Sequence, residues 1–249
     1  MKKTALPFLF LNMAMTADGK IATANRAISS FGSARDQAHL YELRATADAV
    51  MCGARTVDSD EVHLGPGAPK YRRQRLRHGL AEHHLRVVVS GSGTINPQAA
   101  IFQQRFSPII ILTTERAPRR RQAALRELAE EVRVCGEKEI DWPDTLAWLR
   151  RQWRVKRLLA EGGGELNDAL FRAGLVRELH LTICPLVFGG RTAPTVAEGT
   201  GAASLADACP LELQSLRRVG AELFLVYRVG PAQPARKHGF RLASPRNNR

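Results

Sequence analysis

Short apolar runs rich in β-branched residues alternate with helical patterns along most of the chain. The apolar runs predict strands at residues 8–15, 48–52, 86–90, 109–113, 132–135, 157–161 and 178–184. Apolar residues at helical spacing predict helices at 34–44, 119–130, 142–152 and 166–173. This alternation is typical of an α/β fold, in which a mostly parallel sheet is covered by helices on both faces.

The end of the chain breaks this rhythm. Two apolar runs at 211–219 and 222–229 flank a Gly220-Ala221 turn, which predicts a C-terminal antiparallel hairpin and therefore a mixed sheet. Because we find no internal repeat and no interdomain linker, we expect one domain over residues 1–230. The remaining 231–249 is basic and rich in proline, and we expect it to be disordered.

The formal net charge of +13 raises the question of a nucleic-acid partner. The segment 231–249 supplies +5 of this charge, and the other basic clusters are scattered along the chain. Aromatic residues, which would stack on bases, make up only 6% of the sequence. A basic nucleic-acid-binding module therefore stays an alternative, but a solvated basic surface with a few arginines holding a ligand phosphate fits the composition better.

Cysteine and hydrophobic content exclude several other classes. The four cysteines have no Cys-x-x-Cys spacing, so neither a structural metal site nor a disulfide framework is indicated. No apolar run is long enough to span a membrane. The apolar stretch at 5–11 continues into Asn12 instead of a small-residue cleavage site, so we expect a first strand and a cytoplasmic protein without a signal peptide.

The most informative local pattern is Leu158-Leu-Ala-Glu-Gly-Gly-Gly-Glu-Leu166. An apolar strand ends at Glu161, and the glycines Gly162, Gly163 and Gly164 lead directly into a helix. Such a joint presents unpaired N–H groups at a helix start without side chains that would block a phosphate. It matches neither the dinucleotide fingerprint nor a P-loop, and a tight turn that only needs glycine dihedrals is the structural alternative.

Polar residues at the ends of other strands extend this pattern. Asn12 lies within a core strand, where its amide needs hydrogen-bond partners from the protein or a ligand. Gly53 and Thr56 suit a pyrophosphate or nicotinamide contact, although helix capping explains Thr56 equally well. Ser90 and Thr113 follow buried strands and are candidates for the adenosine side of a dinucleotide site, with turn formation as the alternative.

Four segments carry a family resemblance. They are Met15-Thr-Ala-Asp-Gly-Lys-Ile-Ala, Leu43-Arg-Ala-Thr-Ala-Asp-Ala-Val-Met-Cys-Gly-Ala-Arg-Thr-Val, Leu159-Ala-Glu-Gly-Gly-Gly-Glu-Leu and Gly174-Leu-Val-Arg-Glu-Leu-His-Leu. In this order they resemble the pyrimidine reductase family of riboflavin biosynthesis, the family of the C-terminal domain of bifunctional RibD proteins. The resemblance implies a dihydrofolate-reductase-like fold, a homodimer, NADPH as hydride donor and a ribosylamino-pyrimidine 5′-phosphate that is reduced at C1′ to the ribitylamino form.

The resemblance also implies roles for individual residues. Asn12, Thr16, Asp18 and Ser33 would bind this small-molecule substrate. Gly53, Thr56 and the turn from Gly162 to Gly164 would hold NADPH. Glu161 would lie beside the reacting ribose, and Glu161 and Asp60 are the candidates for binding sugar hydroxyls or relaying a proton.

Two departures from the family pattern leave the substrate open. Arg55 replaces a glycine next to the cofactor turn, and Asp60-Glu61-Val62 replaces Asp-Asp-Pro. A divergent NADPH-dependent reductase of another small heterocycle or carbonyl compound is therefore the second hypothesis. The zinc-deaminase elements His-x-Glu and Pro-Cys-x-x-Cys are absent, so no deaminase accompanies the reductase in this sequence, and a deaminated or a non-deaminated pyrimidine is equally compatible with it.

Overall fold

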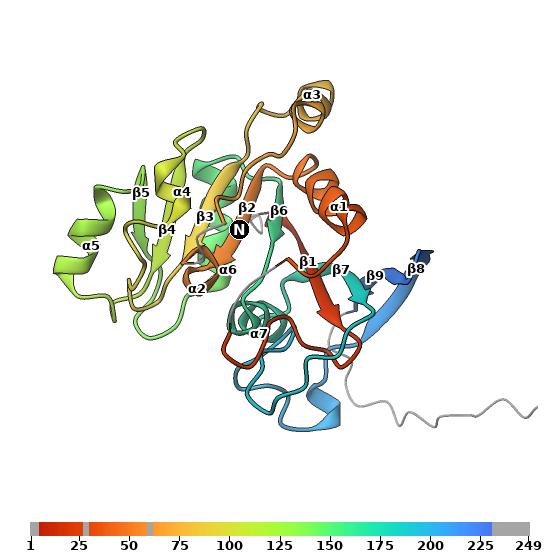
Figure 1. Cartoon of the computed structure of the whole chain (residues 1–249). Helices are drawn as coiled ribbons and strands as arrows, with labels where there is room; N and C mark the ends of the chain where they lie inside the picture. The colour runs from red at the N-terminus through yellow and green to blue at the C-terminus, as the bar shows by residue number, and fades with distance from the viewer. Residues whose placement is uncertain (1–4, 27–29, 59–61, 231–249) are drawn as a thin grey trace, which may run out of the picture.

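The computed structural model describes residues 5–26, 30–58 and 62–230. Its centre is a nine-stranded sheet with the order β5-β4-β3-β2-β6-β1-β7-β9-β8 (Figure 1). The seven strands from β5 to β7 pair in parallel, whereas β9 pairs antiparallel with both β7 and β8. The mostly parallel mixed sheet and its C-terminal hairpin are therefore confirmed.

The elements follow one another in regular alternation. The strands are β1 Phe8–Thr16, β2 Ala49–Gly53, β3 Leu85–Val89, β4 Ile109–Thr113, β5 Glu131–Val134, β6 Arg157–Ala160, β7 Val176–Cys184, β8 Leu211–Val219 and β9 Glu222–Val229. The helices are α1 Ala34–Arg44, α2 Ala54–Val57, α3 Pro69–Arg77, α4 Ala100–Gln103, α5 Arg119–Arg126, α6 Trp142–Gln152 and α7 Gly164–Arg172, with a short 3₁₀ turn at Leu205–Asp207. The predicted bounds of α1, α6, β4 and both hairpin strands agree with these ranges.

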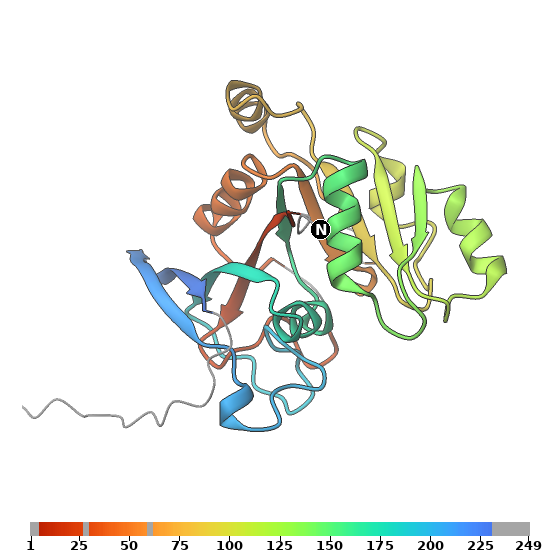
Figure 2. The ribbon, with the colours of Figure 1, turned by 180° about the vertical axis from the view of Figure 1, so that it is seen from behind.

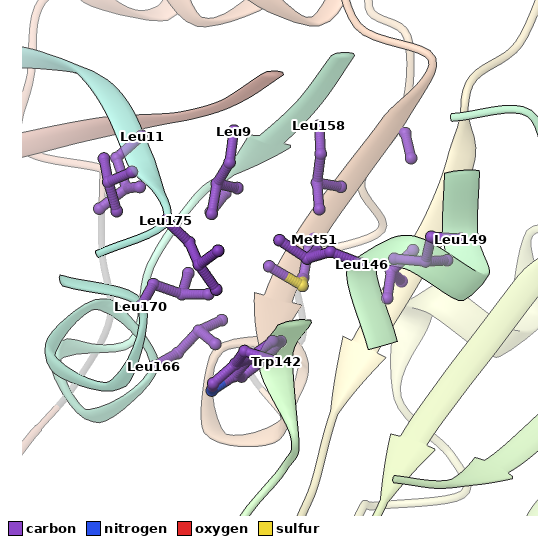
Figure 3. Packing of buried hydrophobic residues seen from close by; sticks show 14 of the residues in the cluster. Leu9, Leu11, Met51, Trp142, Leu146, Leu149, Leu158, Leu166, Leu170 and Leu175 are labelled. Carbon is purple, nitrogen blue, oxygen red and sulfur yellow. The ribbon is translucent and has the colours of Figure 1, made fainter. Parts of the chain in front are cut away.

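Two hydrophobic clusters form the core, one on each face of the sheet. Helices α6 and α7 cover one face, where Leu146 and Leu170 pack against strand residues such as Leu158 (Figure 3). Figure 2 shows α6 lying across this face. The opposite face contains Phe10 and Leu159 and is packed by residues from α1, α4 and α5. Helices on both faces bury the central strands such as β2, β4 and β6, which explains their near-continuous apolar sequences.

Helix α3 was not predicted, since its residues were interpreted as a basic cluster after a long loop. Its mean hydropathy is low, but Arg75 is only 1% exposed. The Arg75 guanidinium donates hydrogen bonds to the carbonyls of Arg44, Ala47 and Ala81. A buried arginine that satisfies backbone acceptors therefore anchors this helix, and the local pattern cannot reveal such a role.

The parallel arrangement brings the polar strand ends to one edge of the sheet. Strand β6 lies between β2 and β1, so the glycine turn after β6 adjoins the turn after β2. The N–H of Gly53 donates to the carbonyl of Gly162 at 3.0 Å, which joins the two turns directly. Crevices at the carboxyl ends of parallel strands are the usual ligand sites of such sheets.

Candidate active site

The turn from β6 into α7 depends on its glycines. Gly162 and Gly163 have φ angles of 93° and 88°, which residues with a side chain rarely adopt. At Gly164 a Cβ atom would lie 2.7 Å from the carbonyl oxygen of Thr195. Only glycine is therefore compatible with this close approach of two backbone segments.

The same turn leaves the start of α7 open. Gly163 is the N-cap of this nine-residue helix and provides no side-chain cap. Gly53 occupies the same position before α2, again without a side-chain cap. The first N–H groups of α7 are thus available to an anionic ligand, and the helix dipole favours such a ligand at this end.

A cavity of about 710 Å³ extends from these two helix starts along the ends of β2 and β3. Gly53, Thr56, Ser90 and Gly163, all predicted to bind cofactor, line it. Three arginines and four carboxylates also lie on the lining: Arg55, Arg116, Arg172, Asp58, Glu139, Asp141 and Glu165. We call it the dinucleotide cavity, because its size and its uncapped helix start suit a ligand with phosphate groups.

A second cavity of about 440 Å³ adjoins the first on the α1 side of the sheet. Asn12 from β1 and Glu161 after β6 line it together with Asp36 and Leu40 from α1. Thr56 and Gly163 belong to the lining of both cavities. We call it the substrate cavity, since a group that extends from the dinucleotide cavity past Thr56 would meet a molecule held there.

Strand alternation explains why Asn12 and Glu161 meet. Phe10 and Leu159 contribute to the core beneath α1, and successive strand residues point to opposite faces. The side chains two positions later, Asn12 in the middle of β1 and Glu161 just after β6, therefore point to the same face. Asn12 is 9% exposed and its Oδ1 atom has no hydrogen-bond partner, so this buried acceptor is free for a ligand.

Glu161 forms a buried ion pair that sequence reasoning missed. Arg44 donates from Nε to Oε1 at 2.6 Å and from Nη2 to Oε2 at 2.5 Å, and it also donates to the carbonyl of Gly65. The two side chains are 8% and 9% exposed. Burial alone lowers the pKa of Arg44, but the charge and hydrogen bonds of Glu161 outweigh this effect and raise the pKa above its usual value.

Helix α1 supplies the residues that the sequence analysis did not select. Asp36 and Leu40 line the substrate cavity, and Arg44 holds Glu161. The spacing of four residues places all three on one side of the helix. The sequence contains one indication of this role. Asp36 and Arg44 share the side of the helix that faces inward, and buried charges need partners.

The structure does not bring Thr16 and Asp18 to the lining of either cavity. The Thr16 hydroxyl donates to Asp18 at 2.5 Å, and Asp18 accepts the N–H groups of Phe188 and Gly189. The hydrogen bond from Thr16 is the largest influence that lowers the pKa of Asp18. Because Phe188 packs edge-on against Phe31 of the substrate cavity, this turn supports the cavity wall from behind.

Ser33 caps α1 and lies beside the substrate cavity. Its Oγ accepts the N–H groups of Arg35 and Asp36, which makes Ser33 the N-cap of this helix. Its own N–H and O–H groups donate to Glu222 of β9 at 2.7 and 2.5 Å. Neighbouring Gly32 and Asp36 line the cavity, whereas Ser33 is not part of the lining.

Of the two predicted adenosine-side residues, only Ser90 lines the dinucleotide cavity. Its hydroxyl donates to the carbonyl of Thr94. Thr113 is fully buried and donates to the carbonyl of Gly91, so it stabilises the loop after β3 from inside. Asp60 lies outside the described residues, as does the segment 231–249.

Arg55, the residue that departs from the family pattern, lies where the cavities join. It lines both cavities and forms an exposed ion pair with Glu165 at 2.8 Å. Exposed pairs of this kind hold side chains only weakly, so Arg55 is free to turn toward a bound phosphate.

The described part of the chain offers neither a metal site nor a membrane span. No group of three or more His, Cys, Asp or Glu side chains is arranged to hold a metal ion within these residues. None of the helices described here has the length and apolar character needed to cross a membrane.

The chain is similar to proteins that are named as reductases. Residues 7–225 match the family described as the RibD C-terminal domain. The 2,5-diamino-6-ribosylamino-4(3H)-pyrimidinone 5′-phosphate reductase of Methanothermobacter thermautotrophicus is 35% identical over 223 residues, which are 90% of this chain and 98% of that protein. A protein of the same name from Aquifex aeolicus is 28% identical over 227 residues, covering 90% and 96%.

The fold has solved counterparts. A pyrimidine reductase-like protein from Corynebacterium diphtheriae matches with a TM-score of 0.76 and 21% identity, over 90% of this chain and 92% of that chain. At this identity the similarity demonstrates a common fold. The match over residues 7–225 and the 35% identity confirm the resemblance carried by the motifs, and the chain belongs to the RibD C-terminal domain family.

Proposed function

We propose that this protein is an NADPH-dependent oxidoreductase that reduces a ribosylamino-pyrimidine 5′-phosphate to its ribitylamino form in riboflavin biosynthesis. The names of its relatives support this function. The observation that carries it is the junction of two cavities at Thr56 and Gly163, one beside an uncapped helix start and one containing Asn12 and Glu161. Hydride transfer requires two ligands held in contact in such an arrangement.

The residues of the dinucleotide cavity fit NADPH. The uncapped N–H groups of α7 suit the pyrophosphate, and Ser90, on the lining after β3, is our candidate for the adenosine side. Arg116 is a candidate for the 2′-phosphate, because a guanidinium binds phosphate oxygens in pairs. When bound, the nicotinamide would supply a hydride near Thr56 and Gly163.

The residues of the substrate cavity fit a phosphorylated ribosylamine. The unpaired Oδ1 of Asn12 can accept a hydrogen bond from a pyrimidine amino group. Glu161, fixed by Arg44, is a hydrogen-bond acceptor for ribose hydroxyls. Arg26 is a cation on the lining, where it pairs with Glu198 at 3.2 Å, and is our candidate for the 5′-phosphate.

The test is an assay of the purified full chain for NADPH oxidation. The two substrates are 2,5-diamino-6-ribosylamino-4(3H)-pyrimidinone 5′-phosphate and its deaminated counterpart, and the mass of the product identifies the ribitylamino compound. We expect turnover with at least one of them. Tight NADPH binding without turnover of either pyrimidine would contradict the proposed substrate.

Arg55 supports one alternative, a reductase of another small heterocycle or carbonyl compound. A cation at the junction of the cavities adds bulk and charge where the family pattern has glycine. The variant Arg55→Gly distinguishes the two hypotheses. An increase in activity with the pyrimidine after this change would indicate that the natural substrate is a different one.

We also propose that the protein forms a homodimer, because the edge strand β8 exposes apolar side chains. This edge strand exposes Leu211, Leu213 and Leu216 at 44%, 50% and 56%. A register shift between Leu213 and Ser215 leaves all three opposite β9 residues of one face, Val229, Tyr227 and Leu225. Exposed leucines gathered on one face of an edge strand are typical of a surface that a partner covers.

A further inference from the structure

The proposed reduction requires a proton as well as a hydride, and assigning the source of that proton rests on the proposed function. A ribosylamine is a closed ring in which C1′ is bonded to the ring oxygen O4′. Adding a hydride at C1′ requires that this bond break, and O4′ must then gain a proton. Water is a poor acid at neutral pH, so a positioned acid lowers the barrier to this step.

Four carboxyl side chains line the substrate cavity within the described residues, Asp36, Asp58, Glu161 and Glu198. Three of them already accept from a donor. Glu161 pairs with Arg44, and Glu198 pairs with Arg26. Asp58 accepts the N–H of Asn96 at 2.8 Å at the exposed junction with the other cavity. The carboxylate oxygens of these three residues are therefore already engaged by protein donors.

Asp36 differs from these three because its charged neighbour is another carboxylate. Burial, the largest influence, raises the pKa of Asp36, and the charge of Glu222 raises it further, while a hydrogen bond from Thr182 opposes them in part. When several carboxyl groups line one cavity, the group whose surroundings disfavour its anion is the best candidate for the proton donor.

The neighbouring residues hold Glu222 in place. It is 5% exposed, and it accepts the N–H and O–H groups of Ser33 and the thiol of Cys184. Burial raises the pKa of Cys184 to about 12, so this thiol stays a donor. Ser33 therefore links the cap of α1 to Glu222 and keeps that carboxylate close to Asp36.

The backbone also makes room for Asp36. A Cβ atom on Gly32 would collide with the Asp36 side chain, so the glycine leaves room for Asp36 in its present position. Helix α1 carries both Asp36, on the cavity lining, and Arg44, which fixes Glu161 on the same lining. One rigid helix thus sets the positions of an acid and of an ion-paired carboxylate around the substrate cavity.

We propose that Asp36 is the catalytic acid that protonates the ribose ring oxygen, and that Glu222, held by Ser33 at the start of the same helix, is its positioning residue. The C1′–O4′ bond breaks as the exocyclic nitrogen forms a double bond to C1′, the bonding electrons pass to O4′, and Asp36 gives its proton to O4′. A bound nicotinamide would supply the hydride that reduces C1′ and would itself be oxidised, and the nitrogen would regain its electron pair. Asp36 recovers a proton from water.

The first test uses Asp36→Asn, which keeps the shape of the side chain and removes its proton. We expect kcat to fall about 100-fold or more, the range of general acid catalysis. Binding of NADPH and of the ribitylamino product, measured by calorimetry, should change by less than threefold. With NADPH deuterated at the transferred position, the isotope effect on kcat should fall toward one, since ring opening then limits the rate. Glu42→Gln, on the outer side of α1, is the matched control.

The second test uses Glu222→Gln. Removing this negative charge lowers the pKa of Asp36, so the loss of kcat at alkaline pH should move to lower pH than in the wild type. The other titratable groups near Asp36 are Cys184, which stays neutral, and Glu161 and Arg26 on the cavity wall, which both variants retain. In Asp36→Asn this alkaline limb should be absent.

Distinct results separate the two proposals. Wild-type protein that turns over neither pyrimidine overturns the proposed function and, with it, the role of Asp36. Wild-type turnover together with an Asp36→Asn variant of unchanged kcat, pH profile and isotope effect overturns the role of Asp36 alone. A variant that loses NADPH and product binding in parallel with kcat would show that Asp36 has a structural role instead.

Discussion

At the scale of single residues, the chemistry of the site depends on paired charges. Arg44 and Glu161 satisfy each other in a buried bidentate contact, whereas Asp36 has Glu222 beside it. The two arrangements have opposite effects, since an opposite charge favours the ionised form and a like charge disfavours it. One cavity therefore contains a fixed hydrogen-bond acceptor and a separate acid.

Removing the partner of Glu161 should lower the free energy of unfolding. In Arg44→Gln a buried carboxylate loses its cation, and we expect a loss of about 3–5 kcal/mol of unfolding free energy in urea. The control Arg133→Gln breaks a surface pair with Asp144 and should cost less than about 1 kcal/mol. Equal losses in the two variants would contradict the importance of burial at the Arg44 pair.

The raised pKa of Asp36 also predicts how stability depends on pH. A carboxyl group with a raised folded pKa contributes stability below its unfolded value of 3.8, and this contribution is lost as pH rises through the folded value. Asp36→Asn cannot ionise, so its Tm should exceed that of the wild type at pH 8. The difference should shrink as the pH is lowered toward 4, and a difference that grows on acidification would contradict the shift.

At the scale of elements, the turn between β6 and α7 connects the two cavities. Gly163 lines both of them, and Gly164 lies against the backbone of the loop that carries Pro194 and Glu198 on the substrate side. The carbonyl of Gly164 also accepts the N–H of Glu198 at 2.9 Å. The geometry of this turn therefore shapes the substrate cavity. It also leaves the first N–H groups of α7 without a side-chain cap.

A methyl group at this turn should disturb both stability and binding. Gly164→Ala places a Cβ 2.7 Å from the Thr195 oxygen, and such overpacking costs about 1–3 kcal/mol. We expect a rise in KM for the pyrimidine, because the loop with Glu198 must move. Gly174→Ala, where φ is 65° and a Cβ meets nothing within 4 Å, strains only the local backbone; it is the control that should lose stability but leave KM unchanged.

At the scale of the whole molecule, the sheet has two functionally different halves. The parallel strands β1, β2 and β3 and the turn after β6 line the cavities, whereas the hairpin of β8 and β9 lies at the edge beyond β7 (Figure 1). Strand β9 contributes Glu222 to the site, so the hairpin is connected to the chemistry as well as to the proposed dimer surface.

The proposed homodimer predicts a change of mass when its leucines become charged. The double change Leu213→Glu and Leu216→Glu should convert a dimer into a monomer in sedimentation velocity, because two charges would have to be buried in the interface. The neighbouring change Gln214→Glu alters an exposed residue at the register shift and should leave the dimer intact. Wild-type protein that sediments as a monomer would exclude this surface as an interface.

The sequence by itself determined most of the architecture. Strand and helix alternation, the C-terminal hairpin, the cap at Ser33 and the glycine turn after Glu161 are local features, and local periodicity and turn chemistry specify them. The motifs also identified the family, because several specific segments occur in order along one chain.

Only the tertiary structure decided how charged side chains are paired. Arg44 and Glu161 are 117 positions apart, and no local pattern distinguishes a buried partner from a solvated charge. The same holds for Arg75 of α3, for Thr113 of β4, which bonds to the loop after β3 instead of lining a cavity, and for Glu222 beside Asp36. Such contacts arise from packing between distant segments, so the residues that set the charge of the site became visible only when the sheet brought α1, β6 and β9 together.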